Sequence, residues 1–199
     1  MINIEVFIIV IMIIFIIIVL YFKYSINNMT YIKSNIDNNF YLVRDNIDKQ
    51  RAANILAKMR QNVIKLSDYL YNNIENSSNK EYKEYIIRLH DRINDIVIVE
   101  STQDSIYTSF SVNKGEQIVF CLRSKKDINN LHDINLMMYV ILHEISHVAC
   151  PIYDNHGPLF KKIFAFITSN AINIGIYNKI NFDQNNEEYC GLMITNSIV

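Results

Sequence analysis

The sequence is poor in the residues that break regular structure: only 4 glycines and 2 prolines occur among 199 residues, and tryptophan is absent. This scarcity excludes a collagen-like or Gly/Pro-rich low-complexity chain. The sequence also lacks an excess of positive or negative charge, since 19 Lys and Arg residues balance 20 Asp and Glu residues. Without a basic excess, nucleic acid is not an expected partner. Half of the residues are hydrophobic, which suffices for one folded domain, alone or with an appendage.

Cysteine is scarce as well. Cys121, Cys150 and Cys190 are odd in number and widely spaced, and no two of them form a CxxC pair. This pattern does not indicate a disulfide framework. We therefore expect reduced thiols in a cytosolic compartment.

One long hydrophobic run is present near the start of the chain. Residues 6–22 contain no charged residue and no helix breaker, which predicts a transmembrane helix within an anchor at residues 1–23. A cleaved signal peptide is disfavoured, because Glu5 replaces the basic start and no small-residue cleavage site follows. Lys23 and Lys33 follow the run, so the positive-inside rule predicts a single-pass membrane protein whose C-terminal part is cytoplasmic.

The remainder divides into an Asn-rich juxtamembrane linker at residues 24–43 and one domain at residues 44–199. Apolar residues at spacings of three and four predict helices at about 45–75, 82–93 and 133–149, and another from about residue 157. β-branched runs predict strands at 95–99, at 106–112 and 117–122 as a hairpin, and near 187–194. The expected fold class is α+β. The apolar stripe within residues 52–70 would also suit a coiled coil, but it is short, so packing within the domain is favoured.

The sharpest chemical signal is the run His143-Glu144-Ile145-Ser146-His147. Residues four apart share one face of a helix, so the two imidazoles can hold one zinc ion. Glu144 lies beside that face, where its carboxylate can act as a general base on a water molecule. Two structural histidines near a surface glutamate are the alternative.

A catalytic zinc usually has three protein ligands and an open position. His156 is the leading third ligand, because Pro151 ends the preceding helix and lets the chain double back. Cys150 is a rival, since thiolates bind zinc well, and it would close the site into a structural one. Glu187 or Glu188 is a more remote alternative. His90 and His132 are interpreted as surface or capping residues.

The segment HEISHVACPIYDNHGPLFKKIF, residues 143–164, resembles the metal-binding core of SprT/WLM-type zincin metallopeptidases. Residues 107–108, 119–123 and 188–191 extend the likeness to the membrane-anchored members encoded by large DNA viruses of eukaryotes. The resemblance implies a zincin-like domain and zinc-dependent peptide-bond hydrolysis of a protein or peptide substrate, at a host membrane or in a virion. It also implies a substrate-pairing edge strand at residues 118–122 and an oxyanion-stabilising residue, either Tyr189 or Arg123.

The resemblance also sets limits. No zinc ribbon or basic tail follows the metal core, which argues against a DNA–protein crosslink as substrate. The alternative function is a non-catalytic viral or membrane structural protein that uses zinc for folding, and a coiled-coil membrane adaptor ranks last. An intact Glu144 favours the enzyme, because a structural zinc site does not need that carboxylate. The sequence does not indicate an oligomeric state.

Overall fold

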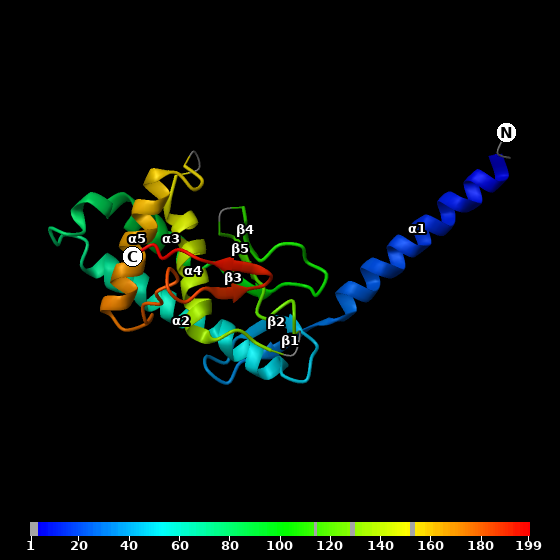
Figure 1. The fold of residues 1–199 in the computed structure, drawn as a ribbon, viewed down its shortest axis with the longest axis horizontal. Helices are drawn as coiled ribbons and strands as arrows, with labels where there is room; N and C mark the ends of the chain where they lie inside the picture. Colours follow the sequence, from blue (N-terminus) through cyan, green and yellow to red (C-terminus); the bar gives the residue numbers. More distant parts are fainter. Residues whose placement is uncertain (1–3, 114, 128–129, 152–153) are drawn as a thin grey trace.

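The protein is described by a computed structural model that covers residues 4–113, 115–127, 130–151 and 154–199, with the backbone alone at residues 5, 22 and 24–27. Figure 1 shows helix α1 extending away from a body of helices and short strands. The elements in chain order are α1 (Ile4–Asn27), β1 (Met29–Lys33), β2 (Phe40–Arg44), α2 (Lys49–Asn72), the 3₁₀ turn Lys80–Tyr82, α3 (Lys83–Ile93), β3 (Val97–Glu100), β4 (Ser109–Val112), β5 (Gln117–Phe120), α4 (Ile134–Ala149), α5 (Pro158–Asn173), β6 (Glu187–Tyr189) and β7 (Leu192–Ile194).

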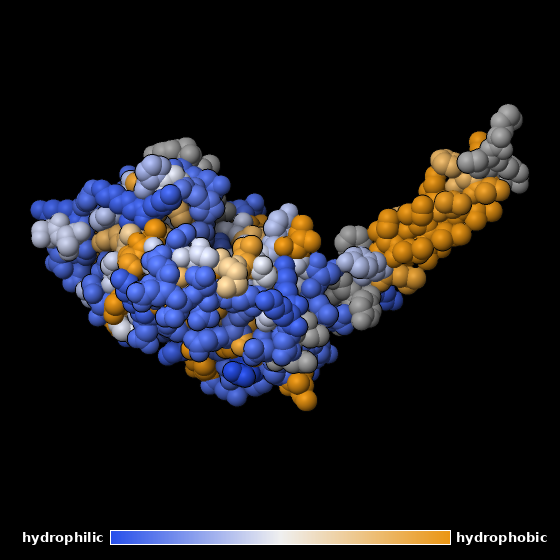
Figure 2. Space-filling view, viewed as in Figure 1, coloured by the Kyte–Doolittle hydropathy of each residue, from blue (hydrophilic) through white to orange (hydrophobic). Residues whose placement is uncertain are grey.

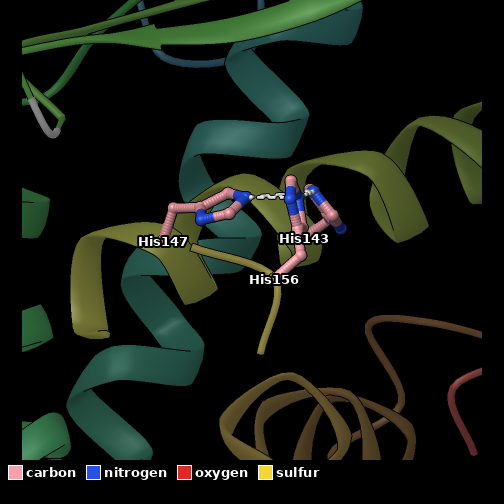
Figure 3. Close-up of side chains that lie close together, drawn as sticks. All are labelled: His143, His147 and His156. Carbon is pink, nitrogen blue, oxygen red and sulfur yellow. Dashed lines mark hydrogen bonds between the residues drawn. The ribbon is translucent and has the colours of Figure 1, made fainter. Parts of the chain in front are cut away.

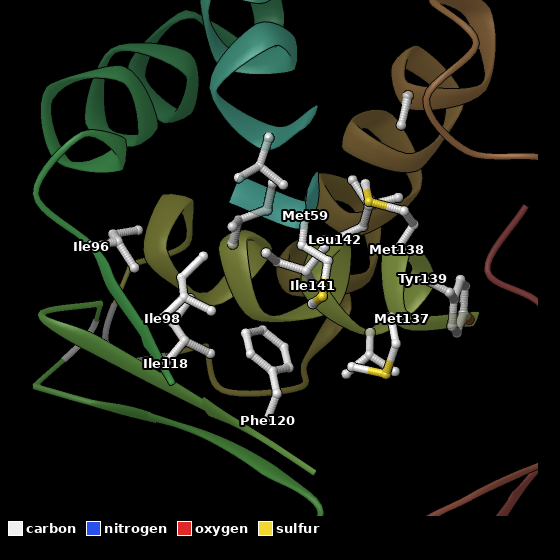
Figure 4. Packing of buried hydrophobic residues seen from close by; sticks show 14 of the residues in the cluster. Met59, Ile96, Ile98, Ile118, Phe120, Met137, Met138, Tyr139, Ile141 and Leu142 are labelled. Carbon is white, nitrogen blue, oxygen red and sulfur yellow. The ribbon is translucent and has the colours of Figure 1, made fainter. Parts of the chain in front are cut away.

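Helix α4 is the centre of the body. It is apolar on nearly all sides, and a helix of that kind is expected to be buried. It packs against α2, α3, α5 and strand β4. Its residues Met137 and Ile141 belong to the same buried cluster as Ile98, Ile118 and Phe120 of the three-stranded sheet (Figure 4). The core therefore lies between that sheet and the helices, and α4 runs through it.

The three-stranded sheet has the order β3–β5–β4. Strand β3 runs parallel to β5, and β4 pairs with β5 antiparallel, with Ser109 opposite Phe120. The predicted hairpin and α+β class are confirmed. The expected substrate-pairing edge at residues 118–122 is wrong, because β5 is the central strand and β4 is the outer one. The interpretation missed this because strand β4 and the loops on either side of it separate β3 from β5 in the sequence.

The predicted helices are confirmed as α2, α3, α4 and α5, within a few residues at their ends. The apolar stripe of α2 is buried, with Leu56, Met59 and Leu66 inaccessible to solvent. This helix packs against α3 and α4. The stripe thus serves the core of its own domain, as expected.

The segment expected to be a linker, residues 24–43, contains most of a β-hairpin. Strands β1 and β2 pair antiparallel, with Met29 opposite Arg44. Tyr41 and Val43 alternate toward the core and are buried, and both strands contact α2. Only two inward-facing residues mark β2, so the surrounding asparagines concealed its alternation.

The expected transmembrane anchor at residues 1–23 is wrong, and so is the single-pass membrane localisation that followed from it. Crossing a bilayer core takes about 20 consecutive apolar residues. Among the residues whose side chains the structure describes, no helix supplies a run of that length and apolarity. The apolar surface of α1 stands apart from the largely polar surface of the body (Figure 2). The Tyr21 hydroxyl near the end of α1 donates a hydrogen bond to Asp104.

The expectation of three reduced cysteines is wrong for two of them. Cys121 and Cys190 form a disulfide across a sequence separation of 69 residues, while Cys150 is a buried free thiol. Cys121 directly follows β5, and Cys190 lies in the turn between β6 and β7. The disulfide therefore joins the last hairpin to the central strand of the sheet, a proximity that sequence spacing does not reveal.

Candidate metal centre

The start and composition of α4 place the motif histidines on one helix face. Asp133 caps the helix, with its side chain accepting a hydrogen bond from the Asn135 amide. Sixteen helical residues follow without a break, ending at Ala149. His143 and His147 are one turn apart and therefore project side by side.

The loop after α4 returns the chain to these histidines. Cys150 leaves the helix with an extended backbone, and Pro158 begins α5 directly after Gly157. The Asp154 carboxylate accepts a hydrogen bond from the Phe160 amide at 2.9 Å. A Cβ atom at Gly157 would lie 1.6 Å from Oδ1 of Asp154. A larger residue at position 157 would therefore displace the Asp154 carboxylate, and His156 directly precedes this tight corner.

The three predicted metal-binding histidines come together. Their Nε2 atoms form a triangle with separations of 3.2 Å between His143 and His147, 3.1 Å between His147 and His156, and 3.2 Å between His143 and His156 (Figure 3). Zinc–nitrogen distances of about 2.0–2.1 Å at tetrahedral angles place ligand nitrogens about 3.3 Å apart. The triangle therefore fits a zinc ion, and the three histidines could hold a metal ion.

Aromatic packing orients all three imidazoles. The ring of Phe160 stacks on His147 with centroids 4.2 Å apart, and it meets His143 and His156 edge-on, at 5.0 Å from each. Phe164 adds a second edge contact to His143. Burial, together with the neighbouring imidazoles, lowers the pKa of His143 to about 3. This ring is accordingly neutral at physiological pH, which is the form that binds a metal.

Glu144 lies on the adjoining face of α4, with only 5 % of its surface exposed. Burial raises the pKa of its carboxyl, and a hydrogen bond from Ser109 opposes that shift. The Ser109 hydroxyl donates to Oε1 of Glu144 at 2.7 Å. A carboxylate with a raised pKa can both accept and return a proton near neutral pH.

A cleft of about 220 Å³ opens beside Glu144 and His147, and Ser111 of β4 and Asp154 of the loop contribute to its lining. The carboxylate and one histidine of the centre thus face a space that a small chemical group can enter. The site is concave and has few polar groups converging on it, as binding sites commonly do.

The alternative ligands are not part of this cluster. The Cys150 thiol donates to the carbonyl of Asp154 at 3.3 Å. Glu188 accepts hydrogen bonds from Ser124 and from the Gly191 amide. His90 stacks on Tyr71 near the surface, whereas His132, expected to be a surface or capping residue, is buried beside Cys190.

The two residues considered for oxyanion stabilisation differ in their surroundings. Arg123 is buried and forms ion pairs with Glu100 and Asp48, so its guanidinium is committed to the core. Tyr189 is 3 % exposed, and its hydroxyl donates to the carbonyl of Thr108 at 3.4 Å. Burial raises the pKa of Tyr189, and the charge of Glu144 adds to the shift. Tyr189 thus lies near Glu144 as a buried neighbour.

Sequence reasoning missed three contributors to the centre. Ser109 was interpreted only as part of a strand, and nothing in its spacing connects it with Glu144. Asp154 was not singled out, because it stands three residues before Gly157 and so lies outside the N-cap position that marks the start of α5. Phe160 was recognised as part of the motif but not as the ring that backs all three imidazoles.

The fold and site define an α+β protein with a three-histidine centre beside a buried carboxylate. No family model matches the chain. It is 45% identical over 170 residues to "Uncharacterized protein R325" of Acanthamoeba polyphaga mimivirus, covering 85% of this chain and 84% of that protein. The chain belongs to the same protein family as R325. It is also 38% identical over 72 residues to "Uncharacterized protein 136R" of Invertebrate iridescent virus 6, covering 36% of this chain and 39% of that protein. Both relatives are viral proteins, which supports the expected viral origin.

Among solved structures, the chain is similar to the crystal structure of Wss1 from Saccharomyces cerevisiae, with a TM-score of 0.36 and 20% sequence identity, over 48% of this chain and 77% of that chain. A crystal structure of a Wss1 mutant gives the same TM-score and identity, over 50% of this chain and 86% of that chain.

Proposed function

We propose that this protein is a zinc-dependent metallopeptidase that hydrolyses peptide bonds. The observation that carries the proposal is the combination of three converging Nε2 atoms with a buried glutamate at the adjoining cleft. A purely structural zinc site is normally closed by four protein ligands and needs no carboxylate beside it. Here three histidines converge and Glu144 remains outside the cluster, which is typical of a catalytic site.

In the proposed mechanism His143, His147 and His156 would hold the metal, and Phe160 keeps their rings in place. Bound zinc would supply a Lewis acid that lowers the pKa of water and polarises a carbonyl group. Glu144 accepts a proton from the attacking water and then donates it to the departing amine. The raised pKa of its buried carboxyl suits both steps.

The proposed substrate is a protein or peptide. Strand β4 is the outer strand of its sheet and packs against α4, and Ser111 from this strand lines the cleft. An extended peptide lying along β4 would pass the three histidines. The balanced charge of the chain disfavours nucleic acid as a substrate.

The test is a pair of measurements on the zinc-loaded full chain and its Glu144→Gln variant: metal content and cleavage of a quenched-fluorescence peptide library. Removing only the general base should leave zinc content unchanged and lower turnover by about a hundredfold or more. Glu84→Gln is the matched control, because Glu84 is exposed on α3 and pairs with Arg88 away from the site. Equal activity in the Glu144 and Glu84 variants would refute the role of Glu144. A zinc-loaded wild type that cleaves nothing would favour a zinc-stabilised structural protein instead.

A further inference from the structure

The Glu144 carboxylate has a partner that lies far from the histidine motif in the sequence. Ser109 is the first residue of β4, 35 positions before Glu144, and its hydroxyl donates a 2.7 Å hydrogen bond to Oε1. At this length the bond is strong, because its acceptor is ionised when Glu144 acts as a base. The bond therefore ties one carboxylate oxygen, Oε1, to strand β4.

A buried base needs such a partner. Glu144 is 5 % exposed, so water contributes little to orienting its carboxylate. A glutamate side chain has three rotatable bonds, and each alternative rotamer would move the reacting oxygen away from the centre. A catalytic group must be held within about 0.5 Å of its working position. A hydrogen bond from a fixed strand supplies that restraint.

Ser109 is itself well fixed. Its backbone pairs with Phe120 of the central strand, and the preceding residue, Thr108, accepts hydrogen bonds from the Cys121 amide and the Tyr189 hydroxyl. Tyr189 belongs to the hairpin that the disulfide ties to the sheet. The donor is therefore anchored by the central strand and by the last hairpin of the chain.

We propose that Ser109 is a positioning residue that holds the Glu144 carboxylate in its proton-accepting orientation. This inference rests on the proposed peptidase function. Ser109 is not one of the three clustered histidines, and it acts only through the Glu144 carboxylate. Its effect should therefore appear in kcat, with little change in KM or in metal binding.

The test compares Ser109→Ala, Ser109→Cys and Ser109→Thr in the zinc-loaded full chain, using one quenched-fluorescence peptide that the wild type cleaves. Losing a hydrogen bond to a charged group should lower kcat by about ten- to a hundredfold in the alanine variant. The cysteine variant, a weaker donor of similar size, should fall between alanine and wild type. Ser109→Thr keeps the hydroxyl and should recover most of the activity. KM and zinc content should stay within about twofold throughout.

Ser124→Ala is the matched control, because the Ser124 hydroxyl also donates to a carboxylate, that of Glu188, at 3.1 Å and away from the centre. It should keep the wild-type kcat. If Ser109→Ala and Ser109→Cys keep kcat within twofold while Glu144→Gln is inactive, the positioning role is refuted and the peptidase function stands. Loss of zinc in any of the three Ser109 variants would make Ser109 a structural support of the metal centre and would likewise overturn the inference. Absence of cleavage by the wild type refutes both proposals.

Discussion

Gly157 is the position where the smallest change should disturb the metal centre most. A Cβ atom there would lie 1.6 Å from Oδ1 and 2.7 Å from Cγ of Asp154, so the Asp154 side chain must move. That movement breaks its 2.9 Å hydrogen bond with the Phe160 amide at the start of α5. The backbone at Gly157 is extended, with φ −73°, so alanine fits the local conformation and the clash alone causes the damage.

The size of the effect follows from these contacts. A lost capping hydrogen bond costs about 1 kcal/mol, and displacing a packed side chain adds about 1 kcal/mol or more. We expect Gly157→Ala to lower the free energy of unfolding by about 1 to 2 kcal/mol. His156 precedes the substituted residue, so zinc affinity should also fall by about tenfold, as when a residue that orients a ligand is lost.

A double variant isolates the cause. Asp154→Ala removes the clashing carboxylate and should itself cost about 1 kcal/mol. Adding Gly157→Ala to it should cost nothing further and should even stabilise slightly, because alanine reduces the freedom of the unfolded chain. Urea unfolding of the zinc-free proteins and zinc competition with a chromophoric chelator measure the two quantities. Additive losses in the double variant would refute the steric explanation. Gly175→Ala is the control: with φ +71° and no atom near its Cβ position, it should cost about 1 kcal/mol and leave zinc affinity unchanged.

Three further outcomes are expected. His156→Ala should weaken zinc binding by about a hundredfold or more, whereas Cys150→Ser should leave zinc affinity nearly unchanged in a chelator competition. A loss of zinc affinity in Cys150→Ser but not in His156→Ala would disprove the ligand assignment. Replacing Cys121 and Cys190 by serine should lower the free energy of unfolding by about 4 kcal/mol, because the disulfide closes a loop of 69 residues; an unchanged urea midpoint would count against this. Burial and the neighbouring imidazoles lower the pKa of His143 from 6.5 to about 3. The unfolded zinc-free chain therefore binds a proton that the folded one does not, so its stability should be full above about pH 6.5 and decline as the pH falls toward 3. His143→Ala should flatten that decline in urea titrations at several pH values.

Sequence reasoning was most successful where the structure depends on local spacing. The helical period of residues 133–149 predicted that His143 and His147 share one helix face with Glu144 beside it, because residues four apart share a face in any helix. Pro151 and the Gly157-Pro158 pair likewise indicated a helix end and a helix start. Because these signals bring the chain back toward the motif helix, His156 could be proposed as the third member of the cluster.

Sequence reasoning failed where residues distant in the chain meet. The β1–β2 hairpin was missed because only two inward-facing residues mark β2. A separate error was the interpretation of the long apolar run of α1 as a membrane anchor. The Cys121–Cys190 disulfide was missed because neither spacing nor number indicates it. Arg123 is buried and forms ion pairs with Glu100 and Asp48. These contacts remove it from the candidates for oxyanion stabilisation, and they too are invisible in the sequence.

The helices and the face of α4 that carries the motif could be predicted from the sequence, because helical periodicity and capping act over a few residues. The tertiary structure alone decided that three Nε2 atoms converge within 3.2 Å and that Phe160 backs their rings. It also decided that Ser109 reaches Glu144 across 35 residues. These contacts depend on how the sheet, the loop and α5 pack against one central helix, and no local pattern encodes packing between elements that are distant in the chain.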